Sequence, residues 1–93
     1  MYEIISAKKF RSSYKKVSRS GNFDLDEFEK VLEFLRKGEG LPKRYFDHAL
    51  KANLGNKREC HISGDMLLTY EVRIDYKVIV LSDIGNHAHV FGS

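Results

Sequence analysis

Four residues from separate segments of the chain could supply acid–base chemistry: His48, His61, Asp65 and His87. Histidine has an ordinary pKa near neutrality, so paired imidazoles can take up and release protons there. Hydrolysis of RNA needs a base for the ribose 2′-OH, a cation for the phosphate and an acid for the departing 5′-oxygen. The four residues fit the first and third tasks without a metal. Taken singly, each histidine is more often an ordinary surface residue.

Basic residues that could bind the phosphates are concentrated in two blocks. Residues 1–23 contain six Lys and Arg against one Glu, and residues 43–58 contain five against one Asp. Lys51, Lys57 and Arg58 belong to the second block, which leads toward His61. Such blocks suit a polyanionic partner, because phosphate contacts give affinity independent of sequence. A solvated helix face is the alternative interpretation.

The composition limits the classes of protein to which the chain can belong. Its 93 residues, 42% hydrophobic and 31% charged, are typical of one folded domain over residues 1–93 and not of a disordered chain. The longest apolar run, residues 78–81, is far shorter than a membrane span of roughly 18 residues. With no secretory signal pattern, we expect a cytoplasmic protein without membrane contacts. Cys60 is the only cysteine, and the close pair His87 and His89 matches no metal motif, so we expect no metal or other cofactor.

The hydrophobic periodicity predicts an α+β fold. A short strand over residues 2–5 is followed by a helix capped by Ser6 and by a second helix capped by Asp24, which ends at residues 38–40. Because only a short loop joins the two helices, they should form an antiparallel hairpin.

After Pro42, residues 43–56 indicate an irregular connection with one short helical turn. Alternating residues then predict strands over 57–62, 66–73 and 77–82, followed by a loop over 85–89. The helix pair should cover one face of this mainly antiparallel sheet. The polar side chains of the strands would then lie on the open face.

Four segments of the chain together resemble the YafQ family of bacterial toxins, in the RelE/ParE superfamily of type II toxin–antitoxin systems. These segments are residues 45–50, 58–65, 67–70 and 84–91. They contain Asp-His-x-Leu, Arg-Glu-Cys-His-Ile and Gly-x-His-x-x-x-Phe elements in the family's order and with family-like gaps. The resemblance spans almost the whole chain. It implies a RelE-like fold and a ribosome-dependent mRNA endoribonuclease.

The resemblance also implies roles for individual residues. His48, His61, Asp65 and His87 fall on the family's acid–base positions, with His87 as general acid and either Asp65 or His61 as base. Phe91 falls on a C-terminal aromatic that helps to hold the substrate. The alternative for Phe91 is simple packing against the sheet.

One residue departs from the family's pattern in a way that bears on activity. Asp83 stands where the family usually has an arginine, and a carboxylate there would repel a phosphate that an arginine would stabilise. Arg58 or Arg73 could supply the missing cation if either reaches the site. Without such a cation, we expect the cleavage rate to fall by about 100-fold or more.

The implied partners are the ribosome, mRNA and a cognate antitoxin. Two toxins and two antitoxins would form a complex that binds operator DNA through the antitoxin. An acidic, partly disordered antitoxin could cover a basic toxin surface and keep it inactive. Asp83 favours one alternative, a catalytically weakened relative that acts mainly as an antitoxin- and nucleic-acid-binding module. A second alternative, a gyrase-directed toxin of the ParE kind, would not require the histidines.

Overall fold

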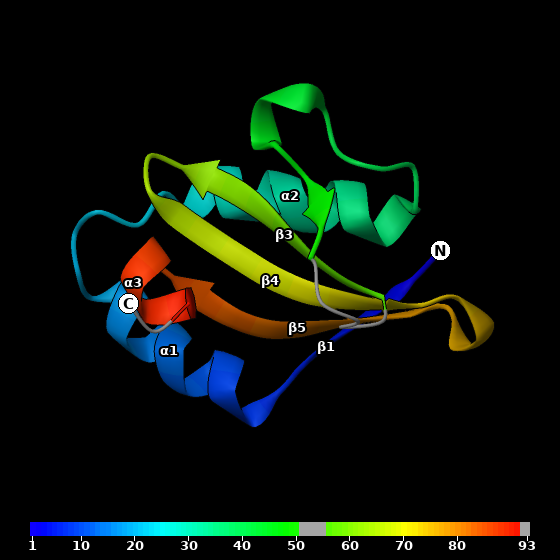
Figure 1. Ribbon diagram of the computed structural model, residues 1–93, viewed down its shortest axis with the longest axis horizontal. Coiled ribbons are helices and arrows are strands. Elements are labelled where there is room, and N and C mark those ends of the chain that lie inside the picture. The colour runs from blue at the N-terminus through cyan, green and yellow to red at the C-terminus, as the bar shows by residue number, and fades with distance from the viewer. Residues whose placement is uncertain (51–55, 92–93) are drawn as a thin grey trace.

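The fold is built on a five-stranded sheet, seen in a computed structural model that describes residues 1–50 and 56–91 (Figure 1). In chain order the strands are β1 (Glu3–Ser6), β2 (His48–Ala49), β3 (Lys57–Ser63), β4 (Met66–Arg73) and β5 (Val78–Gly85). Their order across the sheet is β1-β5-β4-β3-β2. Only the β1–β5 pairing in this sheet is parallel, which confirms the predicted α+β class with a mainly antiparallel sheet.

Helices and short turns occupy the connections between strands, namely α1 (Lys8–Ser18), α2 (Leu25–Lys37), η1 (Lys43–Tyr45) and η2 (Ile74–Tyr76). A short helix, α3 (His87–Phe91), follows the last strand. Figure 1 shows α2 behind the sheet and α1 beside the part of β5 that β1 leaves uncovered, with α3 next to α1. Within the described ranges, no helix is both long and apolar enough to cross a membrane.

The ends of α2 are those predicted from local sequence. The Asp24 carboxylate accepts a hydrogen bond from the Glu27 N–H at 3.0 Å, which satisfies one of the free donors at the helix N-terminus. Phe23, before the cap, packs on Phe28 with ring centroids 5.5 Å apart, as in a hydrophobic staple. Gly38 ends the helix in the left-handed conformation, at φ 72°.

Two local predictions are wrong. Ser6 does not cap α1, because β1 continues through Ser6, which pairs with Leu81 of β5. Ala7 occupies the cap position without a side-chain hydrogen bond. The predicted loop over 85–89 contains the start of α3, whose first turn is capped by Asn86 Oδ1 accepting from the His89 N–H at 2.8 Å.

The hydrophobic core lies between the sheet and the helices. Alternate residues of β3, β4 and β5 meet the apolar stripe of α2, and the most buried members are Val31, Cys60, Leu68 and Ile84. The core therefore uses one face of the sheet and leaves polar residues of the same strands on the other face. Burial raises the pKa of the Cys60 thiol, which keeps this cysteine protonated inside the core.

Gly38→Ala is expected to lower the free energy of unfolding by about 2 kcal/mol. A side chain at φ 72° is strained, and a Cβ there would lie 2.7 Å from Cε1 of Tyr2, so the tyrosine ring would have to move. Gly40→Ala is the matched control, because Gly40 has φ 83° and open space around its Cα. It should lose only about 1 kcal/mol from backbone strain. Urea unfolding of both variants measures the difference, and equal losses would contradict the role given to Tyr2.

Candidate active site

A row of polar side chains crosses four strands on the open face of the sheet. The register pairs His48 of β2 with Glu59 of β3. Thr69 of β4 pairs with Glu59 on one side and with Asp83 of β5 on the other. Directly paired residues project from the same face of a sheet, and His61, two residues beyond Glu59, shares that face. The sheet thus brings histidines of two strands onto one surface.

Glu59 gathers the two histidines. Its Oε1 lies 3.5 Å from His48 Nε2 and 3.7 Å from His61 Nε2. The side chain is almost fully buried, and its Oε2 has no hydrogen-bond partner among the described residues. A buried carboxylate is costly unless donors lie close, and the Nε2 atoms of the two imidazoles are placed where an N–H could donate to it. The motif resemblance did not single out Glu59. The sequence signal that could have done so is its position on the same polar face of the strand as His61.

Both imidazoles also contact Phe46. His48 Nδ1 lies 2.8 Å from the Phe46 carbonyl oxygen, so a proton on Nδ1 donates to that oxygen and Nε2 faces Glu59. The His61 ring packs edge-on against the Phe46 ring, with centroids 5.5 Å apart. The side chains of His48 and His61 remain 53% and 39% exposed, so an external substrate can reach both.

The segment before β2 is anchored at two points. Tyr45 is buried and donates a hydrogen bond to Glu27 Oε2 of α2 at 2.6 Å. Burial, aided by this bond, raises the pKa of Tyr45 to about 12, so the hydroxyl remains a donor. Asp47 accepts hydrogen bonds from the Tyr70 hydroxyl and from Arg58 Nη2, the latter at 2.9 Å. These anchors hold β2 against β3, within the connection predicted to be irregular.

At the far end of the polar row, Asp83 is enclosed by α1 and α3. Its Oδ1 accepts from Ser13 Oγ at 2.7 Å and lies 3.2 Å from His89 Nε2. Lys9 Nζ lies 3.5 Å from Oδ2. Burial alone would raise the pKa of Asp83, but the hydrogen bonds from Ser13, the Ile84 N–H and His89 bring it below the ordinary value.

This arrangement changes the expected effect of Asp83. Its side chain is only 6% exposed, and its charge is offset by Lys9 and by the donors around it. The carboxylate therefore serves mainly to attach α1 and α3 to β5, instead of facing a phosphate. Gly85 permits this attachment, because a Cβ there would lie 2.5 Å from Cδ2 of the His89 ring. Neither Ser13 nor His89 was singled out for this role from the sequence, since Ser13 lies 70 residues from Asp83.

Asp83→Asn is expected to lower the free energy of unfolding at pH 7 by about 1 kcal/mol, the difference between charge-assisted and neutral hydrogen bonds. The folded pKa of Asp83 is depressed, so its stabilisation is complete above the ordinary value of about 4. It is lost as the pH falls through the folded pKa. Urea unfolding between pH 7 and pH 2.5 should show the wild type and variant converging in acid. Asp75→Asn, in the exposed η2 turn, controls for removal of a charge, and a constant difference for Asp83→Asn would contradict the argument.

The other two predicted acid–base residues lie toward α3. Asp65, in the exposed turn between β3 and β4, lines a cavity of about 270 Å³ together with Lys16, Asn86 and His89. His87 is the exposed first residue of α3. In the sheet register, His61 of β3 lies two strands from Gly85, at a usual backbone separation of about 10 Å. The histidine pair and the start of α3 are thus at the same end of the sheet.

The predicted RNA-binding residues are distributed over both faces. Lys57 lines a hollow of about 430 Å³ on the open face, with Lys9, Thr69 and Asp83 among its other walls. Arg58 faces the helix-covered side and is held by Asp47.

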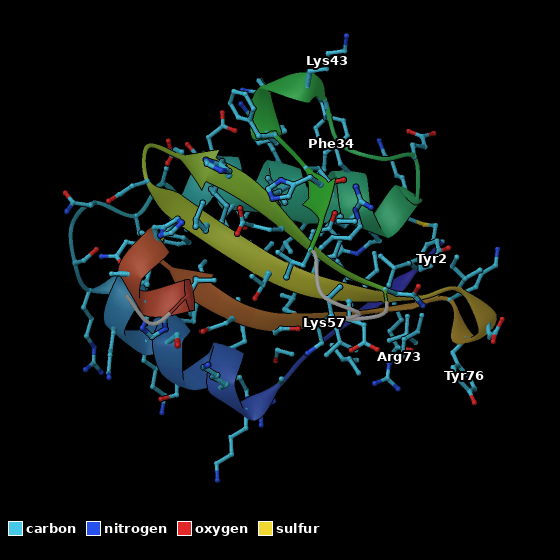
Figure 2. The ribbon with its side chains drawn as sticks, in the orientation of Figure 1. Tyr2, Phe34, Lys43, Lys57, Arg73 and Tyr76 are labelled. Carbon is cyan, nitrogen blue, oxygen red and sulfur yellow. The ribbon has the colours of Figure 1, made fainter. Side chains whose placement is uncertain are left out.

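Arg73 pairs with Glu71 at 3.0 Å, and Figure 2 shows it near Tyr76 at the far end of the hairpin. The bond to Asp47, despite partial burial, raises the pKa of Arg58. The two arginines considered as substitutes for a cation at residue 83 are therefore both ion-paired. Lys51 lies outside the described residues, as does the side chain of Phe91, although α3 includes its backbone.

The described residues contain no group of three or more His, Cys, Asp or Glu side chains that could hold a metal ion. The two histidines lie within 3.7 Å of the Glu59 carboxylate, an arrangement that suits proton transfer and the positioning of an imidazole. A histidine pair on the same face as Lys57 is suited to chemistry on an anionic substrate.

The chain and its fold match known toxins. The family model described as a bacterial toxin of a type II toxin–antitoxin system, YafQ, matches residues 2–92. A metal-bound toxin from Helicobacter pylori is 34% identical, with a TM-score of 0.89 over 98% of this chain and 100% of that one. YafQ in the Escherichia coli DinJ–YafQ complex is 24% identical, with a TM-score of 0.87 over 99% and 100%. The comparison with curated proteins returned no significant match. This chain belongs to the YafQ family of toxins of type II toxin–antitoxin systems.

Proposed function

We propose that this toxin is a ribosome-dependent mRNA endoribonuclease that cleaves by acid–base chemistry without a metal. The observation that carries the proposal is the placement of His48 and His61 within 3.7 Å of one buried carboxylate, on an open face that they share with Lys57 of the same strand, β3, as His61. Imidazoles can transfer protons at neutral pH, and lysines can offset the charge of a phosphate.

The reaction divides among the residues as follows. His61 or Asp65 takes the proton of the ribose 2′-OH, and the 2′-oxygen forms a bond to phosphorus. The bond from phosphorus to the 5′-oxygen breaks, and His87 gives that oxygen its proton. Glu59 holds the imidazoles of His48 and His61 in place, as a third group orients a catalytic base in other enzymes. Lys57 offsets the charge that develops on the phosphate.

Primer extension on a translated mRNA tests this proposal. Addition of the purified toxin to a reconstituted translation reaction should create new 3′ ends at codons occupying the ribosomal A site. The same mRNA without ribosomes should remain intact. The absence of new ends during translation would contradict the proposed activity.

An antitoxin is the proposed partner that keeps the enzyme inactive. The exposed side of α1 offers a basic surface formed by Lys8, Lys9, Arg11, Lys15 and Lys16. An acidic chain that folds on binding would complement this surface. We expect a cytoplasmic complex of two toxins and two antitoxins that binds operator DNA through the antitoxin. Native mass spectrometry of the complex purified from its own cells tests the stoichiometry, and recovery of ribosomes without a small acidic protein would contradict the partner.

The arginines support a second candidate, a catalytically weakened binding module. Arg58 and Arg73 are held by Asp47 and Glu71, and Asp83 takes the place of the family's usual arginine. If this candidate is correct, the toxin will bind the ribosome and its antitoxin but leave no cleavage product in primer extension.

A further inference from the structure

Phe46 combines a left-handed backbone conformation with a highly exposed side chain, and packing of the core explains neither feature. It lies directly after η1 in the left-handed conformation, at φ 50° and ψ 40°. A bulky side chain is uncommon in that region and is strained there. The residue is also 66% exposed, so its side chain gains little from burial. An exposed aromatic side chain at a strained backbone position indicates a functional role more strongly than an ordinary surface phenylalanine does.

The backbone of Phe46 is fixed from both sides. Tyr45, the preceding residue, is 1% exposed and bonded to Glu27, and Asp47, the following residue, is bonded to Arg58 and Tyr70. The Phe46 N–H donates to the Lys43 carbonyl at 3.0 Å. The exposed ring is therefore carried on an anchored turn, where binding a ligand would cost little further ordering.

The position of the ring relates it to the candidate catalytic pair. The ring packs edge-on against His61, at 5.5 Å between centroids and 61° between planes. The carbonyl of the same residue contacts His48 Nδ1. Phe46 therefore touches both histidines that Glu59 gathers and still presents most of its ring to the outside.

We propose that Phe46 is a stacking platform for a nucleobase of the RNA strand that lies at the histidines. This inference rests on the proposed function and adds a base-binding contact to it. Unstacked RNA bases bind the faces of aromatic side chains, a contact that tolerates any base because every base has a π-face. Because the Phe46 ring contacts His61, a base stacked on Phe46 would hold the neighbouring ribose and phosphate against the imidazoles. Lys57 contacts the phosphate backbone, whereas Phe46 contacts a base.

The chain contains no tryptophan, so Phe46→Trp would place a single fluorescent reporter at the platform. The probe is a short single-stranded RNA with 2′-O-methyl groups, which removes the 2′-OH needed for cleavage. A matched oligonucleotide with abasic sites keeps the backbone and lacks the bases. The base-bearing strand should quench the Phe46→Trp emission, and the abasic strand should not. Tyr76→Trp is the control, because Tyr76 is 77% exposed in the η2 turn and touches neither histidine.

Phe46→Leu tests the same contact without a reporter, since leucine keeps the apolar bulk but has no π-face. Its affinity for the base-bearing strand should fall by about 5- to 100-fold, the range that corresponds to one base–aromatic stack. Affinity for the abasic strand should not change, and Tyr76→Leu should bind both strands as the wild type does. Thermal unfolding of each variant checks that the fold is retained.

Several results would overturn the platform. They are equal quenching by both strands, equal quenching at residues 46 and 76, no quenching at all, or unchanged RNA affinity of Phe46→Leu. Loss of a protein partner in Phe46→Leu with RNA affinity retained would also overturn it. Cleavage of translated mRNA is measured separately. If the toxin stacks a base but cleaves no mRNA, the stacking platform stands and the nuclease proposal fails. If Phe46→Leu cleaves as well as the wild type and retains its RNA affinity, the nuclease proposal stands and the stacking platform fails.

Discussion

Replacing His87 with alanine is expected to lower the rate of mRNA cleavage by about 100- to 10,000-fold, the usual contribution of a general acid or base. The reason is that the departing 5′-oxygen would lose its proton donor. The fold should be retained, because His87 is exposed on α3 and alanine favours helix. Single-turnover primer extension on translated mRNA measures the rate, circular dichroism checks the fold, and growth arrest after induction should disappear in parallel.

His89→Ala is the matched control for this experiment. It removes an imidazole from the same helix, but that imidazole binds Ser13 and Asp83 instead of pointing to a substrate. The variant should lose about 1 kcal/mol of unfolding free energy and keep most of its cleavage activity well below its melting temperature. Full toxicity of a folded His87→Ala variant would contradict the assigned role. Loss of cleavage only in a folded His89→Ala variant would move the acid to residue 89.

Glu59→Gln should reduce cleavage by about 100-fold while leaving RNA binding nearly unchanged. The carboxylate lies within 3.7 Å of both His48 and His61, and a neutral amide of the same shape would hold the two rings less firmly, because hydrogen bonds to a charged acceptor are the stronger ones. Displacement of catalytic groups by about 1 Å can cost a factor of this size. Because Glu59 is buried beneath the rings, it should not contact the phosphates, so the loss should appear in kcat and not in KM.

Glu33→Gln is the control for the loss of a carboxylate. Glu33 lies on α2, which covers the other face of the sheet, and pairs with Arg36 at 3.0 Å, so its neutralisation should change cleavage little. Glu59→Asp keeps the charge but shortens the side chain by one methylene, so part of the lost rate should return. Cleavage by Glu59→Gln at the wild-type rate would show that the histidines work without this carboxylate.

Local sequence was sufficient to predict most secondary structure. The Asp24 cap and the left-handed Gly38 depend on neighbours in the chain, and both are seen where they were expected. The alternation through β3 and β4 correctly separated core residues such as Cys60 from polar ones such as His61. Ser6 shows the limit of such signals, because pairing with Leu81 keeps it in β1 in spite of its capping propensity.

Only part of the candidate site could be predicted from the sequence. Motif resemblance singled out His48, His61, Asp65 and His87 as candidates, and their catalytic roles remain predictions. It did not reveal that Glu59 joins the first two, or that Phe46 touches both. Those contacts depend on β2, a two-residue strand whose sequence carries almost no strand signal.

Residues close together in the chain were enough to predict β1, the two long helices, the three long strands and the family, because periodicity, caps and motifs are local properties. Tertiary structure decided which charges meet. Asp83 is a hydrogen-bonded attachment point, and not an exposed repulsive charge, because Ser13 and Lys9 reach it from a helix some 70 residues earlier. A buried carboxylate takes its character from the donors packed around it, and only strand register and helix packing bring those donors into place.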